Sequence, residues 1–417
     1  MRSFQRSQVQ TLLDRLNEPP RHILAVFGPR QTGKTTIVRQ ALRSIDRESR
    51  YLAVDDPDDP GFPVASLGTE LTGIAPGVRN SQWLVDNWNR AREFAQHSPR
   101  GYVLAIDEIQ RIPDWSQTVK GLWDADRSAG CPMHVVVLGS APLIVQSGLT
   151  ESLAGRFEHI FVPHWTFKEM GDAFDFDLDS YLFFGAYPGA AHFLRDERRW
   201  RDYLLDALIE PNIERDILAM TRVDKPILLK RLFEAGAIQS GEILSYNKML
   251  GQLDDAGNTT TLARYLELLS SAGLLTGVPK YSRQRLRSRG SSPKLNVLNT
   301  GLMTAVSGYT FEEARADRRF WGRVAESAVG AHLCNTATRD IDVCYWRESP
   351  FEVDFILQRG PRLVAVEVKS GARLRPTRGL EVFDQRFAPH RSIVVGDSGV
   401  PLNEFLTQPA MTWFEGQ

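Results

Sequence analysis

Short apolar runs alternate with amphipathic segments along the first part of the chain. The runs are continuous and bounded by polar or turn-forming residues, which predicts strands buried on both faces. These predicted strands are Ile23–Phe27, Tyr51–Val54, Tyr102–Ile106 and His134–Leu138. Apolar positions at helical spacing predict helices over 9–16, 36–42 and 83–95. Alternating strands and helices predict an α/β domain with a parallel sheet.

The pattern changes near residue 165. Helical spacing with many aromatic residues, up to about residue 220, predicts a helical lid and connector whose aromatics form a core. Three short amphipathic helices then follow, over 227–235, 246–250 and 260–272, and a strand begins at Leu274. Three helices followed by a strand and a turn rich in Gly and Ser are typical of a winged helix-turn-helix.

The C-terminal segment, from about Arg319, predicts elements in the order α-β-β-β-α-β. They cover 322–335, 342–346, 352–357, 363–369, 379–387 and 392–395. Side chains two residues apart on a strand lie on one face, so Glu367 and Lys369 are predicted to share a face. Asp354 can reach the same place from the neighbouring antiparallel strand, and Glu326 can reach it from the first helix.

The stretch from Gly28 to Thr35 has the pattern G-x-x-x-x-G-K-[ST] and lies between a predicted strand and a predicted helix. The glycines let successive backbone N–H groups point at phosphate oxygens, and the helix N-terminus adds partial positive charge. Lys34 can reach the β- and γ-phosphates, and the Thr35 hydroxyl can bind Mg²⁺. The predicted nucleotide-binding residues are Gly28, Pro29, Arg30, Gln31, Thr32, Gly33, Lys34, Thr35 and Thr36. The expected cofactors are ATP and Mg²⁺.

Two carboxylates end the strand that begins at Tyr102. Asp107 is predicted to hold Mg²⁺, directly or through water. Glu108 is predicted to orient and activate the attacking water. An Asp-Glu pair after a strand is weak by itself, but it is the partner that a complete phosphate loop requires.

Two further residues are candidates for contact with the γ-phosphate. Ser140 ends the run that starts at His134, where a polar group can sense that phosphate, or it is a turn serine that caps the next segment. Arg156 can stabilise transition-state charge on the nucleotide of its own subunit or of a neighbour. The alternative for Arg156 is a surface or packing role.

These motifs together resemble a known family. Residues 28–35, Asp107-Glu108-Ile109-Gln110 and Leu153-Ala154-Gly155-Arg156 resemble the AAA-type ATPase domain of a bacterial and archaeal family that continues into a C-terminal region of unknown function. Residues 293–295, 299–302 and 365–371 resemble that region, so the similarity covers nearly the whole chain. Asn299 stands where the resemblance leads us to expect an acid.

Pattern and resemblance predict four domains. They are a P-loop AAA-type ATPase core (1–165), a helical lid or connector (166–222), a winged helix-turn-helix (223–310) and a small α/β domain like the restriction endonucleases (311–417). The resemblance also implies a homo-oligomer.

A basic stretch without acids lies in the predicted hairpin of the winged helix. Its candidate phosphate contacts are Lys280, Arg283, Arg285, Arg287, Arg289 and Lys294. A flexible basic hairpin tip suits contact with the nucleic-acid backbone, with DNA the expected form. The alternatives are a solvated loop or a winged helix that binds protein.

The C-terminal acids resemble the D…E-x-K pattern of restriction-endonuclease-like nucleases. Glu326, Asp354 and Glu367 can hold one or two Mg²⁺ ions, with Lys369 orienting water or stabilising charge. Three interpretations stay open: an active nuclease site, a nuclease fold kept for binding, and an unrelated charged strand face. Because buried acids are costly without a partner, a cation must offset them, either Lys369, an arginine such as Arg347, or a divalent metal.

Composition excludes some classes of protein. The 417 residues are 42% apolar and 24% charged, with a formal net charge of −1, which argues against a globally basic DNA-coating protein. No apolar run is long enough to span a bilayer, so we expect no membrane partner. Three scattered cysteines without metal-ligand spacing suit a reducing cytoplasm.

The leading hypothesis is a cytoplasmic ATPase that couples ATP turnover to DNA handling. One alternative is a slow ATP-dependent switch whose C-terminal domains bind proteins. Another is a metal-dependent nuclease gated by ATP.

Overall fold

A computed structural model describes residues 4–56, 79–139, 153–217, 223–253, 258–283, 291–369 and 378–415. Contacts divide the chain into two compact units, Met1–Val162 and Pro163–Gln417. This division lies three residues before the predicted end of the first domain. The three other predicted domains all lie in the second unit.

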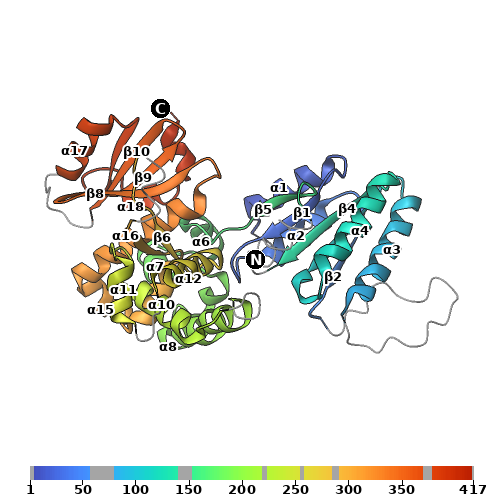
Figure 1. The fold of residues 1–417 in the computed structure, drawn as a ribbon, viewed down its shortest axis with the longest axis horizontal. Coiled ribbons are helices and arrows are strands. Elements are labelled where there is room, and N and C mark those ends of the chain that lie inside the picture. Colours follow the sequence, from blue (N-terminus) through green and yellow to red (C-terminus); the bar gives the residue numbers. More distant parts are fainter. Residues whose placement is uncertain are drawn as a thin grey trace. The chain divides into compact units, whose positions relative to one another are not determined.

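The first unit is built on a parallel sheet (Figure 1). Its strands are β1 (Ile23–Phe27), β2 (Glu48–Ala53), β3 (Tyr102–Asp107), β4 (Met133–Gly139) and β5 (Phe157–Phe161). Their order across the sheet is β2-β3-β4-β1-β5, and every neighbouring pair is parallel. All residues of β1, β3 and β4 are buried, which explains their unbroken apolar runs.

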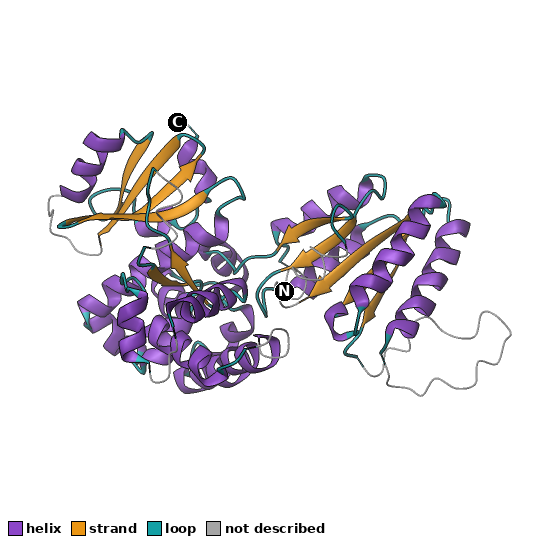
Figure 2. Cartoon of the chain, in the orientation of Figure 1, coloured by secondary structure: helices purple, strands orange, loops and turns teal. Residues whose placement is uncertain are grey.

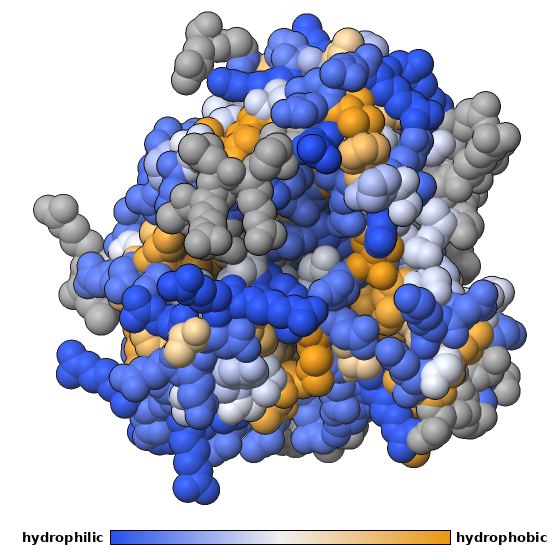
Figure 3. All heavy atoms as spheres, turned by 90° about the vertical axis from the view of Figure 1, so that its left-hand side faces the viewer, coloured by the Kyte–Doolittle hydropathy of each residue, from blue (hydrophilic) through white to orange (hydrophobic). Residues whose placement is uncertain are grey.

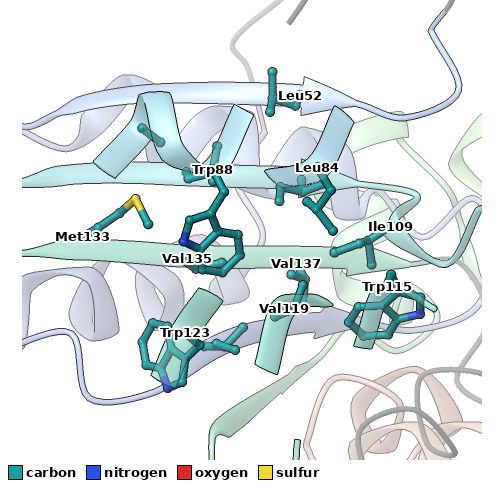
Figure 4. Packing of buried hydrophobic residues seen from close by; sticks show 14 of the residues in the cluster. Leu52, Leu84, Trp88, Ile109, Trp115, Val119, Trp123, Met133, Val135 and Val137 are labelled. Atoms are coloured by element: carbon teal, nitrogen blue, oxygen red, sulfur yellow. The ribbon is translucent and has the colours of Figure 1, made fainter. Parts of the chain in front are cut away.

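Helices cover both faces of this sheet. They are α1 (Ser7–Asn17), α2 (Lys34–Ser44), α3 (Ser81–His97) and α4 (Trp115–Ser128). Alternate residues of β1 belong to different cores: Leu24 and Val26 pack with α1 and α2, whereas Ile23, Ala25 and Phe27 pack with α3 and α4. Figure 4 shows the second of these cores, with tryptophan and aliphatic side chains between the helices and strands.

The second unit begins with the helical, aromatic-rich segment that the sequence predicts. It contains α6 (Phe167–Phe174), α7 (Leu178–Phe184), η3 (Pro188–Phe193), α8 (Glu197–Asp202) and the π-helical segments η4 (Tyr203–Ile209) and η5 (Asn212–Ile217). The rings of Phe183, Phe184 and Trp200 pack against one another and against Phe311. These aromatics form core, as expected.

Three helices and a two-stranded hairpin follow. They are α10 (Pro226–Ile238), α11 (Tyr246–Gln252), α12 (Thr259–Ser271), β6 (Leu275–Val278) and β7 (Lys294–Val297). The side chains of Ser245 and Asn258 cap α11 and α12 by accepting backbone N–H groups. The strands β6 and β7 pair antiparallel, so a two-stranded hairpin follows the three helices.

The C-terminal elements confirm the predicted α-β-β-β-α-β order (Figure 2). After α14 (Thr300–Ser307) and α15 (Phe311–Ala316) come α16 (Arg318–Thr336), β8 (Asp342–Glu348), β9 (Phe351–Arg359), β10 (Arg362–Lys369), α17 (Arg378–Phe387), β11 (Arg391–Gly396), α18 (Leu402–Phe405) and η6 (Ala410–Phe414). The sheet order is β11-β10-β9-β8, in which only β10 and β11 run parallel.

The hairpin is joined to this C-terminal sheet. Backbone N–H of Tyr281 donates to Tyr345 O (2.6 Å), and Tyr345 N–H donates to Pro279 O (3.0 Å), so the chain leaving β6 pairs with β8. The hydroxyls of Ser240 and Ser327, both fully buried, lie 2.7 Å apart between the three-helix segment and α16. These contacts make the two segments one packed body.

The molecular face in Figure 3 is mostly hydrophilic, with apolar positions in small patches. Within the described ranges, no helix combines the length and apolar character needed to cross a membrane.

Candidate nucleotide site and C-terminal acid cluster

The phosphate loop joins the carboxyl end of β1 to the start of α2. A Cβ atom on Gly28 would lie 1.9 Å from the carbonyl oxygen of Val162, so only glycine fits there. Gly33, the residue before α2, has φ of +90°, a left-handed conformation that glycine adopts without steric cost. Both predicted glycines are therefore required by the backbone, and the loop ends at a helix N-terminus suited to phosphate.

Lys34 is directed into the loop. Its Nζ donates to the carbonyl oxygens of Pro29 (2.6 Å) and Gly28 (3.1 Å), and the residue is only 8% exposed. The buried Arg6, which the sequence argument did not identify, donates from Nη1 to Thr32 O (3.0 Å). The loop is thus held in shape by two cations. Arg30 is half-buried, whereas Gln31 and Thr36 are exposed.

Thr35 and Asp107, the two residues predicted to bind Mg²⁺, lie in contact. Thr35 Oγ1 donates to Asp107 Oδ2 at 2.7 Å, and Tyr51 donates to the same oxygen. The Glu108 N–H fixes the other carboxylate oxygen at 2.9 Å. A hydroxyl and a carboxylate side by side are the oxygen donors that Mg²⁺ prefers, so these residues fit the ion that the sequence argument assigned to them.

Glu108 lies beside this pair in a special backbone conformation. Its φ is +53°, a left-handed value that is uncommon for a side-chain-bearing residue and marks functional sites. Gln110 Nε2 donates to Glu108 Oε2 at 2.6 Å. Burial and the neighbouring Asp107 carboxylate raise the pKa of Glu108, while Lys34 opposes the rise. A carboxylate with a raised pKa is a stronger base for water activation.

Arg156 is not brought to the phosphate loop of its own chain. It precedes β5, and its carbonyl oxygen accepts from Ile23 N–H, at the amino end of β1. The phosphate loop follows the other end of β1, five residues away, or about 16 Å along a strand. The guanidinium pairs with Asp124, with Nε to Oδ1 at 2.7 Å. The predicted action of Arg156 on its own subunit's nucleotide is therefore wrong in this structure. Ser140 lies outside the described residues.

The C-terminal acids come together from three elements. Asp354 on β9 accepts from Val368 N–H (2.8 Å) on β10, and Glu367 on β10 pairs with Lys369 (2.6 Å). Glu326 reaches the group from α16. Burial and the Asp354 charge raise the pKa of Glu326 and that of Glu367 to about 7.

Lys294 lies among these acids rather than at the surface. It is fully buried, and its Nζ lies 2.5 Å from Glu326 Oε1 and 3.3 Å from Asp354 Oδ1. The prediction that Lys294 contacts DNA phosphates is therefore wrong. Its position at the start of β7 turns its side chain into the protein. Burial alone would lower the pKa of Lys294, but Asp354 and Glu326 outweigh it and raise that pKa.

The rest of the basic stretch is only partly described. Lys280 is half-buried beside β8, and Arg283 is exposed, with its guanidinium over the Phe387 ring at 5.2 Å. Arg285, Arg287 and Arg289 lie outside the described residues. Among the described residues, no three His, Cys, Asp or Glu side chains form a group that could hold a metal ion.

Asn299 has a structural role. Its Oδ1 accepts N–H groups of Ala186 (3.0 Å) and Gly301 (3.1 Å), which caps α14. Its Nδ2 lies 3.4 Å from a ring nitrogen of His164, a contact in which an amide can donate.

Comparisons with known proteins agree with this architecture. Residues 20–171 match the model of an AAA domain, residues 175–313 match a domain of unknown function (DUF8612), and residues 321–409 match another (DUF4143). An AAA domain at the N-terminal end is therefore followed by two domains of unknown function. Its phosphate loop, Asp107 and Glu108 all lie inside the AAA match.

No curated protein matches the chain. One similar solved structure is that of the Aeropyrum pernix ORC1 protein in complex with DNA. It is 16% identical, and the match covers 74% of this chain and 93% of that chain with a TM-score of 0.31. This likeness is too low to carry an argument about function.

Proposed function

We propose that the protein hydrolyses ATP and couples this turnover to the handling of nucleic acid, with DNA as the expected form. The observation that carries the ATPase part is the convergence of four side chains at the carboxyl edge of one parallel sheet. These are Lys34 and Thr35 after β1, Asp107 at the end of β3, and Glu108 directly after it.

Each of these residues has a distinct role in the proposal. Lys34 exchanges its bonds to the loop carbonyls for the β- and γ-phosphate oxygens. Thr35 and Asp107 hold Mg²⁺, which neutralises phosphate charge when bound. Glu108, kept in place by Gln110, accepts a proton from the attacking water.

The nucleic-acid part is supported by the second unit. Three helices followed by a two-stranded hairpin have the order of a winged helix, and the chain between β6 and β7 contains four arginines and no acid. Clustered arginines suit phosphate contacts that do not depend on base sequence.

ATPase assays with and without single-stranded, double-stranded and forked DNA test the proposal. Stimulation of turnover by any of these forms supports it. Tight nucleotide retention without a DNA effect would favour the switch with protein-binding C-terminal domains. Loss of intact DNA that needs metal would favour a nuclease.

The basic stretch should contact phosphates rather than bases. Changing Arg283, Arg285, Arg287 and Arg289 to glutamine is expected to weaken binding of different DNA sequences equally. The slope of log affinity against log salt should fall by about one per lost contact. Fluorescence anisotropy at several salt concentrations measures both effects.

A matched control removes the same charge elsewhere in the second unit, from the exposed Arg195, Arg198, Arg318 and Arg319. It should keep the wild-type salt slope. Equal slopes for both quadruple variants would show that the loop does not contact DNA.

We propose that Arg156 acts on the nucleotide of a neighbouring subunit. Arg156→Ala should then lower ATP turnover only in assembled protein, and mixing it with Lys34→Ala protein should restore part of the activity. Asp124→Asn, which removes the ion-pair partner but keeps the arginine, should stay active. Full activity of Arg156→Ala at every protein concentration would contradict the role.

A further inference from the structure

We propose that Lys294 is a built-in cation that occupies the Glu326–Asp354 side of the C-terminal acid cluster, in the place where a nuclease of this pattern would hold a divalent metal ion. The cluster consists of Glu326, Glu352, Asp354 and Glu367. The wild-type protein would then bind no metal there, and the C-terminal sheet would serve contact rather than cleavage. This inference does not depend on ATP turnover.

The contacts of the ammonium group carry the inference. Lys294 Nζ lies 2.5 Å from Glu326 Oε1, 3.3 Å from Asp354 Oδ1 and 3.8 Å from Glu352 Oε1. It therefore contacts acids from α16 and β9, two of the three elements that would supply metal ligands. The side chain is also fully buried and lies 4.9 Å from the centre of the Phe355 ring.

Charge and space exclude a second cation at this point. A Mg²⁺ ion takes oxygen ligands at about 2.0–2.1 Å, so an ion bound to Glu326 and Asp354 would fall in the volume of the ammonium group. Two cations this close in a buried site repel each other strongly. Lys294 and a divalent ion are therefore alternatives.

The backbone directs Lys294 towards the acids. Residue 294 pairs with Val278 of β6 on one side and forms a bridge with Ile243 on the other. The next residue, Leu295, donates to Glu242 O (3.0 Å) and accepts from Gly241 N–H (2.8 Å). These bonds fix the backbone from which the side chain extends, and the ion pairs with Glu326 and Asp354 hold its ammonium group.

One carboxylate oxygen at the edge of the cluster is not reached by Lys294. Glu367 pairs with Lys369 through Oε1, while its Oε2 is buried and has no hydrogen-bond partner within the part of the chain that is described. Lys294 lies beside Glu326 and Asp354, so it fills one side of the cluster and not the side of Glu367.

The test is Mn²⁺ binding by the full chain, measured by calorimetry without nucleotide. Every protein tested carries Asp107→Asn, so that the N-terminal metal position does not contribute. The wild-type C-terminal sequence should show no Mn²⁺ binding that depends on Asp354. Lys294→Met should melt at a lower temperature and gain a Mn²⁺ site that Asp354→Ala abolishes.

Metal should also stabilise the variant. When the Mn²⁺ concentration is a hundred times the dissociation constant, the folded-to-unfolded ratio of Lys294→Met should rise about a hundredfold. Lys248→Met, which removes an exposed lysine of α11, is the matched control and should neither lose stability nor gain a site.

If Lys294→Met does not fold, a double variant provides the same test. Lys294→Met with Glu326→Gln removes both partners of the 2.5 Å pair, so it should fold without metal and bind Mn²⁺ more weakly than Lys294→Met. An Asp354-dependent Mn²⁺ site in the wild-type sequence would overturn the inference. So would DNA cleavage by wild type that Asp354→Ala abolishes, or a folded Lys294→Met that binds no Mn²⁺.

Discussion

Lys34→Ala is expected to lower ATP turnover by at least about 10²–10³-fold, the typical cost of removing one group that stabilises transition-state charge. The Lys34 ammonium donates to the loop carbonyl oxygens of Pro29 and Gly28 at 2.6 and 3.1 Å. ATP offers it phosphate oxygens with full negative charge, which are stronger acceptors. Initial rates of phosphate release measure the effect.

A loss of turnover in Lys34→Ala identifies the role of the lysine only if the loop keeps its fold. The hydrogen bonds from Arg6 to Thr32 O and from the Thr32 hydroxyl to Pro29 O remain in Lys34→Ala, so the melting temperature without nucleotide should stay close to wild type. Lys120→Ala, on α4, removes a lysine of the same unit and should keep full turnover. Turnover of Lys34→Ala within tenfold of wild type would remove the lysine from its role.

Glu108→Gln is expected to bind ATP with near wild-type affinity and to hydrolyse it about 10²–10⁴-fold more slowly. Glutamine has the same shape and can keep a contact with Gln110, but its amide cannot accept the proton of water. Because the backbone is left-handed at this position in both proteins, the exchange adds no new strain. Nucleotide binding by fluorescence and turnover by phosphate release separate the two effects.

The pH dependence of turnover provides a second readout of Glu108. A base must be deprotonated to act, so activity should fall as the pH falls through the pKa of Glu108. Burial and Asp107 raise that pKa, which places the loss of activity at a higher pH than for an ordinary glutamate. The residual activity of Glu108→Gln should lack this acid limb. Equal turnover in both proteins would assign water activation to another group.

Local sequence was sufficient for the nucleotide loop. The predicted residues 28–35 form the turn after β1 and the first two residues of α2, because phosphate-binding loops are made from consecutive backbone groups. The continuous apolar runs of β1, β3 and β4 identified strands buried on both faces. The strand β5 was missed, since its sequence Phe-Glu-His-Ile-Phe is only partly buried at the sheet edge.

Contacts between side chains that are far apart in sequence were decided by the tertiary structure. Arg156 belongs to a recognisable motif, but strand direction places it at the amino end of the sheet, opposite the phosphate loop. Lys294 follows a run of arginines and was predicted to lie with them at the surface. Pairing of β7 with β6 and with residue 243 turned it instead towards Glu326 and Asp354. The sequence predicted that the buried acids need a cation, and the packing decided which cation it is. The direction in which β7 presents the Lys294 side chain depends on pairing with distant residues, so no local sequence pattern predicts it.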